Sequence, residues 1–574
     1  MARLNPAVTL ELKSPGRLLL RFELQTILGT LLLLVVGGAV LFPLTLIAIQ
    51  SFSVPVAPGQ TQFGLAGWQA VLTENGLRLA VGNTVLLILA RQIVALPLAV
   101  GMAWIIARTD LPGRNWFEFA FWLSFFLPPL TVTLSWILLL SPQYGLVNQV
   151  LKPLGIGPLN IFSFWGIVWT HLVAHNVSAM VMLLTPAFRN MNASFEEASR
   201  IAGASAPRTL LRIFVPLMLP AILTVQLLVI MRALEGFEVE QILGPPANIQ
   251  VMSTWIYATF LQRLPRIDAA SALAVVMVAV MLCLVGLRNR AVGGRRFTTI
   301  TGKFQGQRLA LGRWKWPAFA VFALVTFLVM AVPFVFATLG TLMKLFGFFS
   351  SDMWTLKHWQ TALADRELVR ALQNTLILAV GTAAIVVVLN SLIAYLIVRT
   401  RFVGRHILDF LTWLPFSVPG ILLSLGLLTM FLTPLFRPLY GSIITLILAG
   451  VIAGLPLAAQ VLKANLMQMG AELEEASWLA GGNWLRTYRR IVLPLIMPTL
   501  VVVALIAFIG AARNISQVAL LSNAANRPLS MLQLDYMAQG RFELASVVAC
   551  LILFLTVGLA VLARVFGYRG GVGS

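Results

Sequence analysis

Long apolar stretches alternate with short polar connections along the whole of this 574-residue chain. A helix needs about 20 apolar residues to cross the hydrocarbon core of a bilayer. The pattern predicts an all-α integral membrane protein with twelve transmembrane helices, because stretches near or above that length recur at 27–50, 83–107, 117–140, 162–187, 214–234, 269–287, 318–340, 374–398, 408–432, 441–462, 491–512 and 544–566. The first stretch is too long for a signal peptide and has no small-residue cleavage site, so we expect it to remain as a helix.

Composition supports this prediction, and the placement of charged residues predicts the orientation of the chain in the membrane. The chain is 59% hydrophobic and 11% charged, which is too much apolar surface for a water-soluble domain. Its net charge of +21 comes from short connections and not from a soluble basic domain, so we expect contact with membrane lipids and no nucleic-acid partner. Cytoplasmic connections are enriched in Lys and Arg. Both termini are therefore predicted to be cytoplasmic, with basic connections at 108–114, 189–212, 288–315, 399–405 and 463–490.

The chain contains an internal repeat. A set of landmarks recurs at a constant offset of 291 positions: Asn83-Thr84, Arg108-Thr109, Gly113-Arg114, Trp122 and Pro128 return as Asn374-Thr375, Arg399-Thr400, Gly404-Arg405, Trp413 and Pro419. Further on the offset falls to 278, so a deletion of 13 residues lies between the two blocks, in the outward loop after the third span of each half. Each half has six spans, an even number, so the halves enter the membrane in the same orientation as parallel repeats.

A hydrophilic stretch separates the halves. We predict a first half at 1–296, a basic cytoplasmic linker at 297–316 and a second half at 317–574. The linker contains Gly302-Lys303, but Phe297 and Phe304 stand where a phosphate-binding loop needs Gly and Ser or Thr, so no nucleotide site is expected there.

One motif occurs twice, between the fourth and fifth spans of each half. It lies near 194–216 and again near 472–494, and it reads Glu197-Ala198-Ser199, Gly203, Ile213 and Val215-Pro216, repeated as Glu475-Ala476-Ser477, Gly481, Ile491 and Leu493-Pro494. The residues themselves predict a helix, a glycine turn and a second helix. Gly203 and Gly481 are placed to end the first helix in a left-handed conformation, Ser194 and Glu197 have capping-box spacing, and Asn483 can cap the second helix.

This spacing resembles the EAA loop, the signature of permeases of binding-protein-dependent ABC importers. The resemblance implies the type I ABC importer permease fold, with two parallel six-helix repeats, in the bacterial inner membrane. It also implies that Glu197, Ala198, Gly203, Glu475, Ala476 and Gly481 couple the chain to a homodimeric ABC ATPase that binds ATP and Mg. A periplasmic substrate-binding protein would be the other partner. Ser199 and Ser477 depart from the second Ala of the motif but keep a small side chain.

Two segments that follow the EAA loops narrow the choice of solute that the chain is expected to carry. Residues 233–245 and 513–530 resemble fused permeases of the ferric-iron type, and the twelve-span fused layout matches that group over nearly the whole chain. The resemblance implies ferric iron as the solute. Relatives in the same group carry thiamine, polyamines or phosphonates, so those alternatives stay open.

Charged residues near the outward ends of the fifth and eleventh spans are candidates for a translocation gate. We select Glu235, Glu238 and Arg513, and the 278 offset aligns Glu235 with Arg513. If the halves pack about an axis along the membrane normal, this pair can close the gate. The alternatives are that both side chains reach water separately and that Glu238 and Glu240 lie in a solvated loop.

Two histidines stand one helical turn apart in the fourth span. His171 and His175 share a helix face, but two nitrogens are too few for a metal site, so packing or interhelical hydrogen bonding is favoured. Prolines should bend four spans and keep them in the protein core rather than facing lipid. These prolines are Pro128, Pro129, Pro415 and Pro419 in the third and ninth spans, and Pro216, Pro220, Pro494 and Pro498 in the fifth and eleventh.

Two other functional classes are disfavoured. An ion-coupled secondary transporter would need acidic relays within its spans, which hold almost none, and it would leave the EAA loops unexplained. An enzyme would need paired carboxylates, an activated nucleophile or a metal triad at membrane depth, and none is evident. We therefore assign no catalytic residues and no cofactor to the chain itself.

Overall fold

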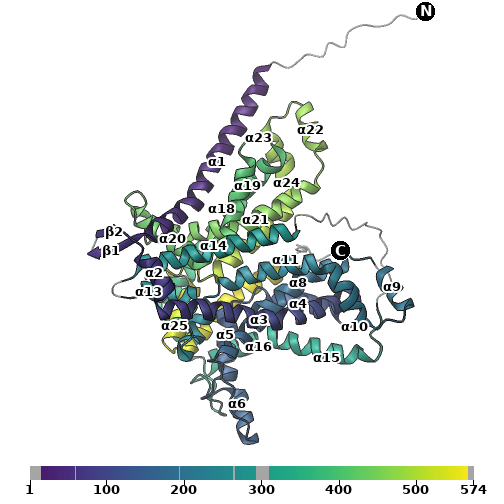
Figure 1. Ribbon diagram of the computed structural model, residues 1–574, viewed down its shortest axis with the longest axis vertical. Helices are drawn as coiled ribbons and strands as arrows, with labels where there is room; N and C mark the ends of the chain where they lie inside the picture. The colour runs from purple at the N-terminus through teal and green to yellow at the C-terminus, as the bar shows by residue number, and fades with distance from the viewer. Residues whose placement is uncertain (1–14, 58–59, 193, 263–264, 293–308, 566–574) are drawn as a thin grey trace, which may run out of the picture.

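The computed structural model describes residues 15–57, 60–192, 194–262, 265–292 and 309–565 (Figure 1). Within these residues, ten helices are long and apolar enough to cross a membrane, and the number is twelve if each of two sharply bent helix pairs is one span. Their positions match the twelve predicted stretches. The prediction of an all-α membrane protein is confirmed, apart from one small antiparallel hairpin of β1 (Ser53–Ala57) and β2 (Gln60–Phe63).

The first half contains six spans joined by short helices. The spans are α1 (Pro15–Gln50), α3 (Asn75–Arg108), the pair α4 (Arg114–Ser124) and α5 (Pro129–Leu140), α7 (Phe164–His171) continuing through a π turn into α8 (Val177–Arg189), α11 (Val215–Leu234) and α14 (Ile267–Val292). The short helices are α2 (Ala66–Thr73), α6 (Leu146–Leu151), α9 (Ser194–Ile201), α10 (Ala206–Thr209), α12 (Glu238–Leu243) and α13 (Met252–Phe260).

The second half repeats this order. Its spans are α15 (Lys315–Thr326) with α16 (Val332–Leu342), α18 (Arg366–Arg399), the pair α19 (Arg405–Trp413) and α20 (Gly420–Leu432), α21 (Ile443–Gln468), α24 (Leu493–Arg513), and α26 (Phe542–Leu553) with α27 (Leu559–Val565). Its short helices are α17 (Lys357–Ala364), α22 (Glu472–Leu479), α23 (Trp484–Thr487) and α25 (Leu529–Ala538).

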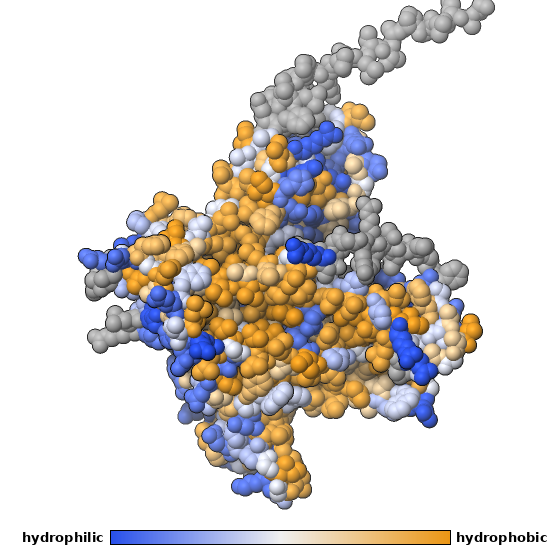
Figure 2. All heavy atoms as spheres, viewed as in Figure 1, coloured by the Kyte–Doolittle hydropathy of each residue, from blue (hydrophilic) through white to orange (hydrophobic). Residues whose placement is uncertain are grey.

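The two ends of the bundle differ in what they carry. Figure 1 shows the β hairpin, α2, α13 and α25 gathered on the left of the molecule, with α9 at the right and α22 at the top, both away from that group. We call these the hairpin end and the EAA end. Between them the visible surface is broadly apolar (Figure 2). On the spans α1, α3 and α18, the side chains of Leu34, Ile93 and Val388 are more than half exposed. An apolar surface of this extent is suited to lipid and not to water.

The proline prediction is confirmed in two spans and wrong in two. The third and ninth spans bend by 104° and 110°, and their second arms, α5 and α20, are almost wholly buried. The fifth and eleventh spans are instead among the more exposed, with 33% and 22% of their most apolar windows buried. A π turn precedes the first proline of each, at Leu210–Phe214 and Tyr488–Val492. Such a turn lets the backbone adjust locally to the hydrogen bond that proline cannot donate. A neighbouring helix is therefore not needed to cover this part of the span.

The end of the linker is attached to the first half. Most of the predicted linker lies outside the described residues, and the domain boundaries stay a prediction. At its described end, Leu309 donates from its N–H to the Arg108 carbonyl and accepts from the Asp110 N–H. The Leu311 N–H donates to Asp110 Oδ1 at 2.8 Å, and this bond lowers the pKa of the Asp110 carboxyl. The second half therefore begins beside the EAA end of α3.

Candidate coupling loops and a cavity between the halves

The glycine turns of both EAA loops have the predicted conformation. Gly203 has φ +72° and Gly481 has φ +83°, in the left-handed region that side chains other than glycine rarely adopt. Asn483 caps the next helix by accepting from the Arg486 N–H at 2.8 Å, as predicted. Ser194, the predicted first cap, instead lies inside α9, and its N–H donates to the Asn192 side chain at 3.1 Å.

Neighbouring acids in each EAA helix point in opposite directions. Glu197 and Glu475, with Ala198, Ala476 and both turn glycines, are exposed. The acids immediately before them, Glu196 and Glu474, are 4% and 2% exposed. A carboxylate so deeply buried requires a partner. The motif thus has an outward face and an inward anchor.

The inward anchor is an arginine at the EAA end of each half's second span. Arg108 Nε lies 2.6 Å from Glu196 Oε1, and Arg399 Nε lies 2.9 Å from Glu474 Oε1. Sequence analysis missed both acids. The signal was present, because an acid precedes each EAA triplet and Arg108-Thr109 and Arg399-Thr400 had already emerged as repeat landmarks.

The serines that depart from the EAA pattern have the same role in both halves. The hydroxyls of Ser199 and Thr209 lie 2.8 Å apart, as do those of Ser477 and Thr487. Each pair joins the EAA helix to the segment leading into the next span. An alanine could not make this bond, so the serine closes the loop across its glycine turn.

Large apolar side chains are also exposed on the EAA helices. Ile201 is 88% exposed and Leu479 is 87% exposed, at positions that align between the halves. Phe195 and Leu473, which also align, are 43% and 56% exposed. Paired apolar side chains beside exposed acids are typical of a protein contact surface.

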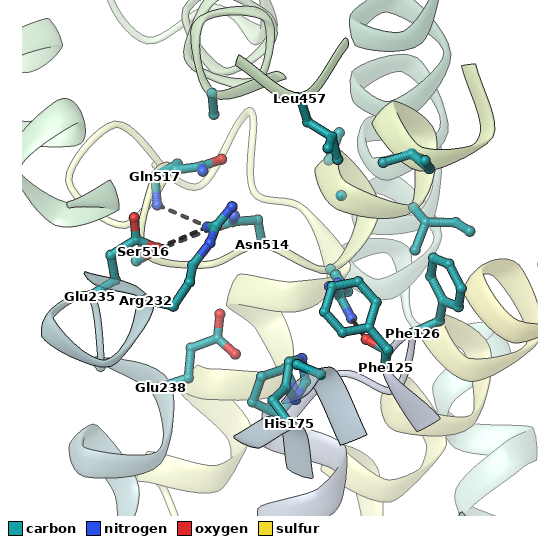
Figure 3. Close-up of a pocket in the computed structure, with 18 of the residues that line it drawn as sticks. Phe125, Phe126, His175, Arg232, Glu235, Glu238, Leu457, Asn514, Ser516 and Gln517 are labelled. Atoms are coloured by element: carbon teal, nitrogen blue, oxygen red, sulfur yellow. Dashed lines mark hydrogen bonds and ion pairs between the residues drawn. The ribbon is translucent and has the colours of Figure 1, made fainter. Parts of the chain in front are cut away.

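A cavity of about 350 Å³ lies between the halves, and all three predicted gate residues line it (Figure 3). Glu235 and Glu238 come from the segment after α11, and Arg513 ends α24. Phe125 and His175 contribute an aromatic wall beside Glu238. The three predicted gate residues therefore line one cavity, and their role as a gate stays a prediction.

The predicted ion pair between Glu235 and Arg513 does not form in the structure. Glu235 Oε2 pairs with Arg232 Nη1 at 2.9 Å, one helical turn away. Arg513 Nη1 donates to the carbonyls of Phe125 at 2.7 Å and Leu127 at 3.3 Å. The physical reason is the bend in the third span: Pro129 has no N–H, so the Phe125 carbonyl loses its helical donor and the guanidinium replaces it.

Of the two acids predicted for the gate, Glu238 is the one that contacts the opposite half. Its Oε1 accepts from the Ile515 N–H of the second half at 3.3 Å, and its Oε2 has no hydrogen-bond partner among the described residues. The acid that was considered as part of a solvated loop is therefore the one that touches the opposite half.

The expected hydrogen bonding of His171 is confirmed. His171 Nε2 lies 2.7 Å from Glu240 Oε1, which joins the fourth span to α12. Arg91 Nη1 lies 3.9 Å from the same oxygen, and Arg91 Nη2 donates to the Ala233 carbonyl at 2.7 Å. Glu240 is 1% exposed and does not lie in a solvated loop. Within the described residues, no group of three His, Cys, Asp or Glu side chains is placed to hold a metal ion.

This buried network belongs to the first half alone. The positions that align with Arg91, His171 and Glu240 in the second half are Thr382, Ala449 and Val518. None of these three side chains can carry a charge. Sequence analysis did not identify Arg91, because nothing local marks which residue faces it across the bundle.

Comparison with known proteins places the chain in a family. The model of the binding-protein-dependent transport system inner membrane component matches residues 95–297 and 387–569, one match in each half. The ferric transport system permease of Actinobacillus pleuropneumoniae is 28% identical over 73% of this chain. A putative ferric transport system permease of Haemophilus influenzae is 30% identical over 70%. These alignments span 61% and 63% of the two relatives' own lengths.

A further relative matches over almost its full length. The second Fe(3+)-transport system permease of Haemophilus influenzae is 23% identical over 93% of this chain and 96% of its own. Because the family model covers more than half of the chain and matches once in each repeat, the chain belongs to the family of binding-protein-dependent transport system inner membrane components.

Proposed function

We propose that the chain is the membrane-spanning permease of an ATP-driven importer, with its EAA end in the cytoplasm. It passes a solute from a periplasmic binding protein through the cavity between its halves. The observation that carries this proposal is the duplicated EAA surface, where each loop exposes an acid and two large apolar side chains while a half-buried arginine pairs with its buried acid. Family membership supports the binding-protein dependence.

The energy source is proposed to be a homodimeric ATPase that docks on α9 and α22. Two aligned contact surfaces in one chain suit a partner with two equivalent sites. Glu197, Ala198, Gly203, Glu475, Ala476 and Gly481 form the exposed edge of these surfaces. ATP and Mg are bound by the partner, and the chain itself contributes positioning and no hydrolysis.

Ferric iron is the proposed cargo. It is supported by three relatives that carry ferric or Fe(3+) transport in their names. The cavity offers Glu238 and His175 beside several arginines, which suits a charged solute better than an apolar one. The same architecture importing thiamine, a polyamine or a phosphonate is the alternative.

The docking surface can be tested by co-purification. Ile201→Asp with Leu479→Asp places charges on the exposed apolar positions of the EAA helices. We expect loss of the ATPase subunit from the purified complex while the chain still inserts in the membrane. Leu435→Asp is the matched control, since Leu435 is 79% exposed on a loop of the second half outside both EAA loops. Full retention of the ATPase in the double variant would contradict the assignment.

The cargo can be tested in proteoliposomes containing the chain and its ATPase. We expect ATP hydrolysis to rise when the binding protein is added with ferric iron and not when it is added with thiamine, spermidine or a phosphonate. Stimulation by one of the other three solutes would keep the importer and replace its cargo. No stimulation by any loaded binding protein would contradict the importer.

Orientation can be tested by cysteine labelling after the two natural cysteines are replaced by serine. Gln60→Cys and Asp352→Cys should react only from the periplasmic side, whereas Arg401→Cys should react only from the cytoplasmic side. All three side chains are exposed. Reaction of Arg401→Cys with a membrane-impermeant reagent in intact cells would reverse the proposed topology.

A further inference from the structure

The second span of each half is a long helix with specific polar contacts at both ends. At the hairpin end of α3, Thr84 Oγ1 accepts from the Met252 N–H at 3.0 Å, and Asn83 Nδ2 donates to the Gln250 carbonyl at 3.0 Å. Met252 is the first residue of α13, so Thr84 satisfies a helix-terminal N–H that has no partner within its own helix. α3 thus holds the connection that follows the fifth span.

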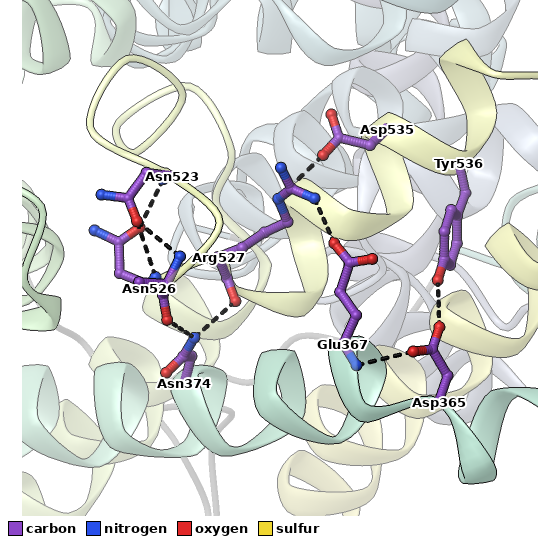
Figure 4. A network of polar contacts seen from close by, with 9 residues as sticks. Asp365, Glu367, Asn374, Asn523, Asn526, Arg527, Asp535 and Tyr536 are labelled. Atoms are coloured by element: carbon purple, nitrogen blue, oxygen red, sulfur yellow. Dashed lines mark hydrogen bonds and ion pairs between the residues drawn. The ribbon is translucent and has the colours of Figure 1, made fainter.

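The second half repeats these contacts, and Figure 4 shows those made by Asn374 and Arg527. Thr375 Oγ1 accepts from the Leu529 N–H, the first residue of α25, at 2.8 Å. Asn374 Nδ2 donates to the carbonyls of Ala525 at 3.0 Å and Arg527 at 3.1 Å. An ion pair strengthens this end, with Arg527 Nη1 2.5 Å from Glu367 Oε1 at the start of α18.

At the EAA end, the same helices hold the coupling loops at two points. Besides its acid, Arg108 donates from Nη1 to the Met191 carbonyl at 3.0 Å, just before α9. Arg399 donates from Nη2 to the Met469 carbonyl, the aligned position, at 2.6 Å. Each arginine therefore fixes both the entry and the first turn of its EAA helix.

The two sets of contacts lie far enough apart along the helix to stand on opposite sides of a bilayer. From Thr84 to Arg108 is 24 residues, or about 36 Å of helix at 1.5 Å per residue. The hydrocarbon core of a bilayer is about 30 Å thick. One continuous helix in each half thus joins the EAA loop to the connection that begins with the cavity residues Glu235 and Glu238 in the first half, or with Asn514 and Ser516 in the second.

We propose that α3 and α18 transmit movement between the ATPase-docking loops and the outer wall of the cavity. In this proposal, which rests on the function proposed above, Arg108 and Arg399 are positioning residues at one end, and Thr84 and Thr375 are positioning residues at the other. Movement of an EAA helix is carried along the second span to α13 or α25. The landmarks Asn-Thr and Arg that the sequence repeat holds at fixed spacing are the residues that make these two attachments.

The outer attachment gives the sharper test, because it is remote from the docking surface. Thr84→Val with Thr375→Val keeps the side-chain shape and removes the two accepting hydroxyls. In proteoliposomes containing the chain and its ATPase, we expect stimulation of hydrolysis by the loaded binding protein to fall about fivefold or more. Basal hydrolysis and the amount of ATPase bound should stay unchanged. Thr84→Ser with Thr375→Ser keeps the hydroxyls and should retain stimulation.

A combined variant tests whether the two attachments act through one helix. Thr84→Val with Glu196→Gln should be no worse than the more impaired single variant, since each already interrupts the same path. Glu118→Gln is the matched control for the ion pair: Glu118 lies 2.6 Å from Arg189 and joins α4 to α8. In the double variant of Glu118→Gln and Thr84→Val, the fold-losses of stimulation measured for the two single variants should multiply. Thr45→Val, which removes only a bond within α1, should have no effect on stimulation.

Three results distinguish this inference from the proposed function. Normal stimulation in the double threonine variant would overturn the inference and leave the importer intact. Multiplying effects of Thr84→Val and Glu196→Gln would also overturn it, since the attachments would then act independently. Absence of stimulation in the unmodified complex would contradict the proposed function itself.

Discussion

The two halves share their ends and differ at the cavity. Each half attaches its EAA helix to the second span through an arginine and a buried acid, and each joins the EAA turn through a Ser–Thr pair. Around the cavity the resemblance stops. The first half buries Arg91, His171 and Glu240, whereas the three aligned positions in the second half hold uncharged side chains.

This contrast separates two requirements that one pseudo-symmetric chain must meet. A homodimeric ATPase would present two equivalent sites, so two similar EAA loops would fit it better than two different ones. A solute that passes through the cavity does not require two equivalent sites, so the walls around it have no reason to match. Under the proposed function, we therefore assign the shared polar contacts to the mechanical parts and the unshared ones to the path of the solute.

The largest effect on stability is expected when the charged residues of the first half's buried network are replaced by the residues that align with them in the second half. Glu240→Val alone leaves Arg91 as an unpaired buried charge, and we expect a loss of about 3–5 kcal/mol in unfolding free energy. The triple variant Arg91→Thr, His171→Ala, Glu240→Val installs the residues of the second half and should recover most of that stability. Thermal unfolding in detergent measures both. A triple variant as unstable as the single would show that the halves differ in packing as well as charge.

A smaller loss is expected at the bend of the third span. Arg513→Met removes the donors that satisfy the Phe125 and Leu127 carbonyls, and hydrogen bonds from charged groups contribute about 1.5–3 kcal/mol. Thermal unfolding should show a loss in that range. Arg232→Met is the control, because the Arg232 side chain is 58% exposed in its ion pair with Glu235. Equal losses in both variants would show that Arg513 does not support the bend.

Some of these features could be predicted from sequence, and others could not. Apolar stretch length located every span, and Pro128-Pro129 and Pro419 located the two sharp bends, because both signals act within a few residues. Gly203 and Gly481 likewise defined their turns locally. Pairing across the bundle is different, since Arg91 and Glu240 are separated by 149 positions and no local pattern states which side chains meet.

Two errors had local causes that the sequence did contain. Glu235 was paired with Arg513 by symmetry, although Arg232 stands three residues before it, at the spacing that brings helical side chains together. The exposed faces of the fifth and eleventh spans were missed because a proline was taken to require burial. The π turns before Pro216 and Pro494 show that the backbone can also adjust locally.

A moderate and equal effect is expected at the two EAA turns. Gly203→Val and Gly481→Val each place a β-branched side chain at positive φ, which costs about 1–2 kcal/mol or more. Uptake in cells should fall to a similar extent in the two variants while the chain still reaches the membrane. Gly203→Asn and Gly481→Asn are the matched controls, because asparagine tolerates this conformation better, and they should keep more activity. Strongly unequal losses would show that the ATPase uses the two loops differently.

The smallest effect on stability is expected from substituting Glu235. The same variants test whether Glu235 and Arg513 close the cavity. The Arg232 side chain of its ion pair is 58% exposed, and pairs of that kind contribute about 0–1 kcal/mol. Glu235→Gln should therefore leave unfolding almost unchanged, and Glu235→Arg with Arg513→Glu should be no better than Arg513→Glu alone, because Arg513 is held by carbonyls of the third span. Uptake and thermal unfolding of the three variants provide the measurement. If the exchanged pair instead recovered the uptake lost in Arg513→Glu, the two residues would meet in another state of the transport cycle, and the cavity would close through the symmetric contact that this structure does not contain.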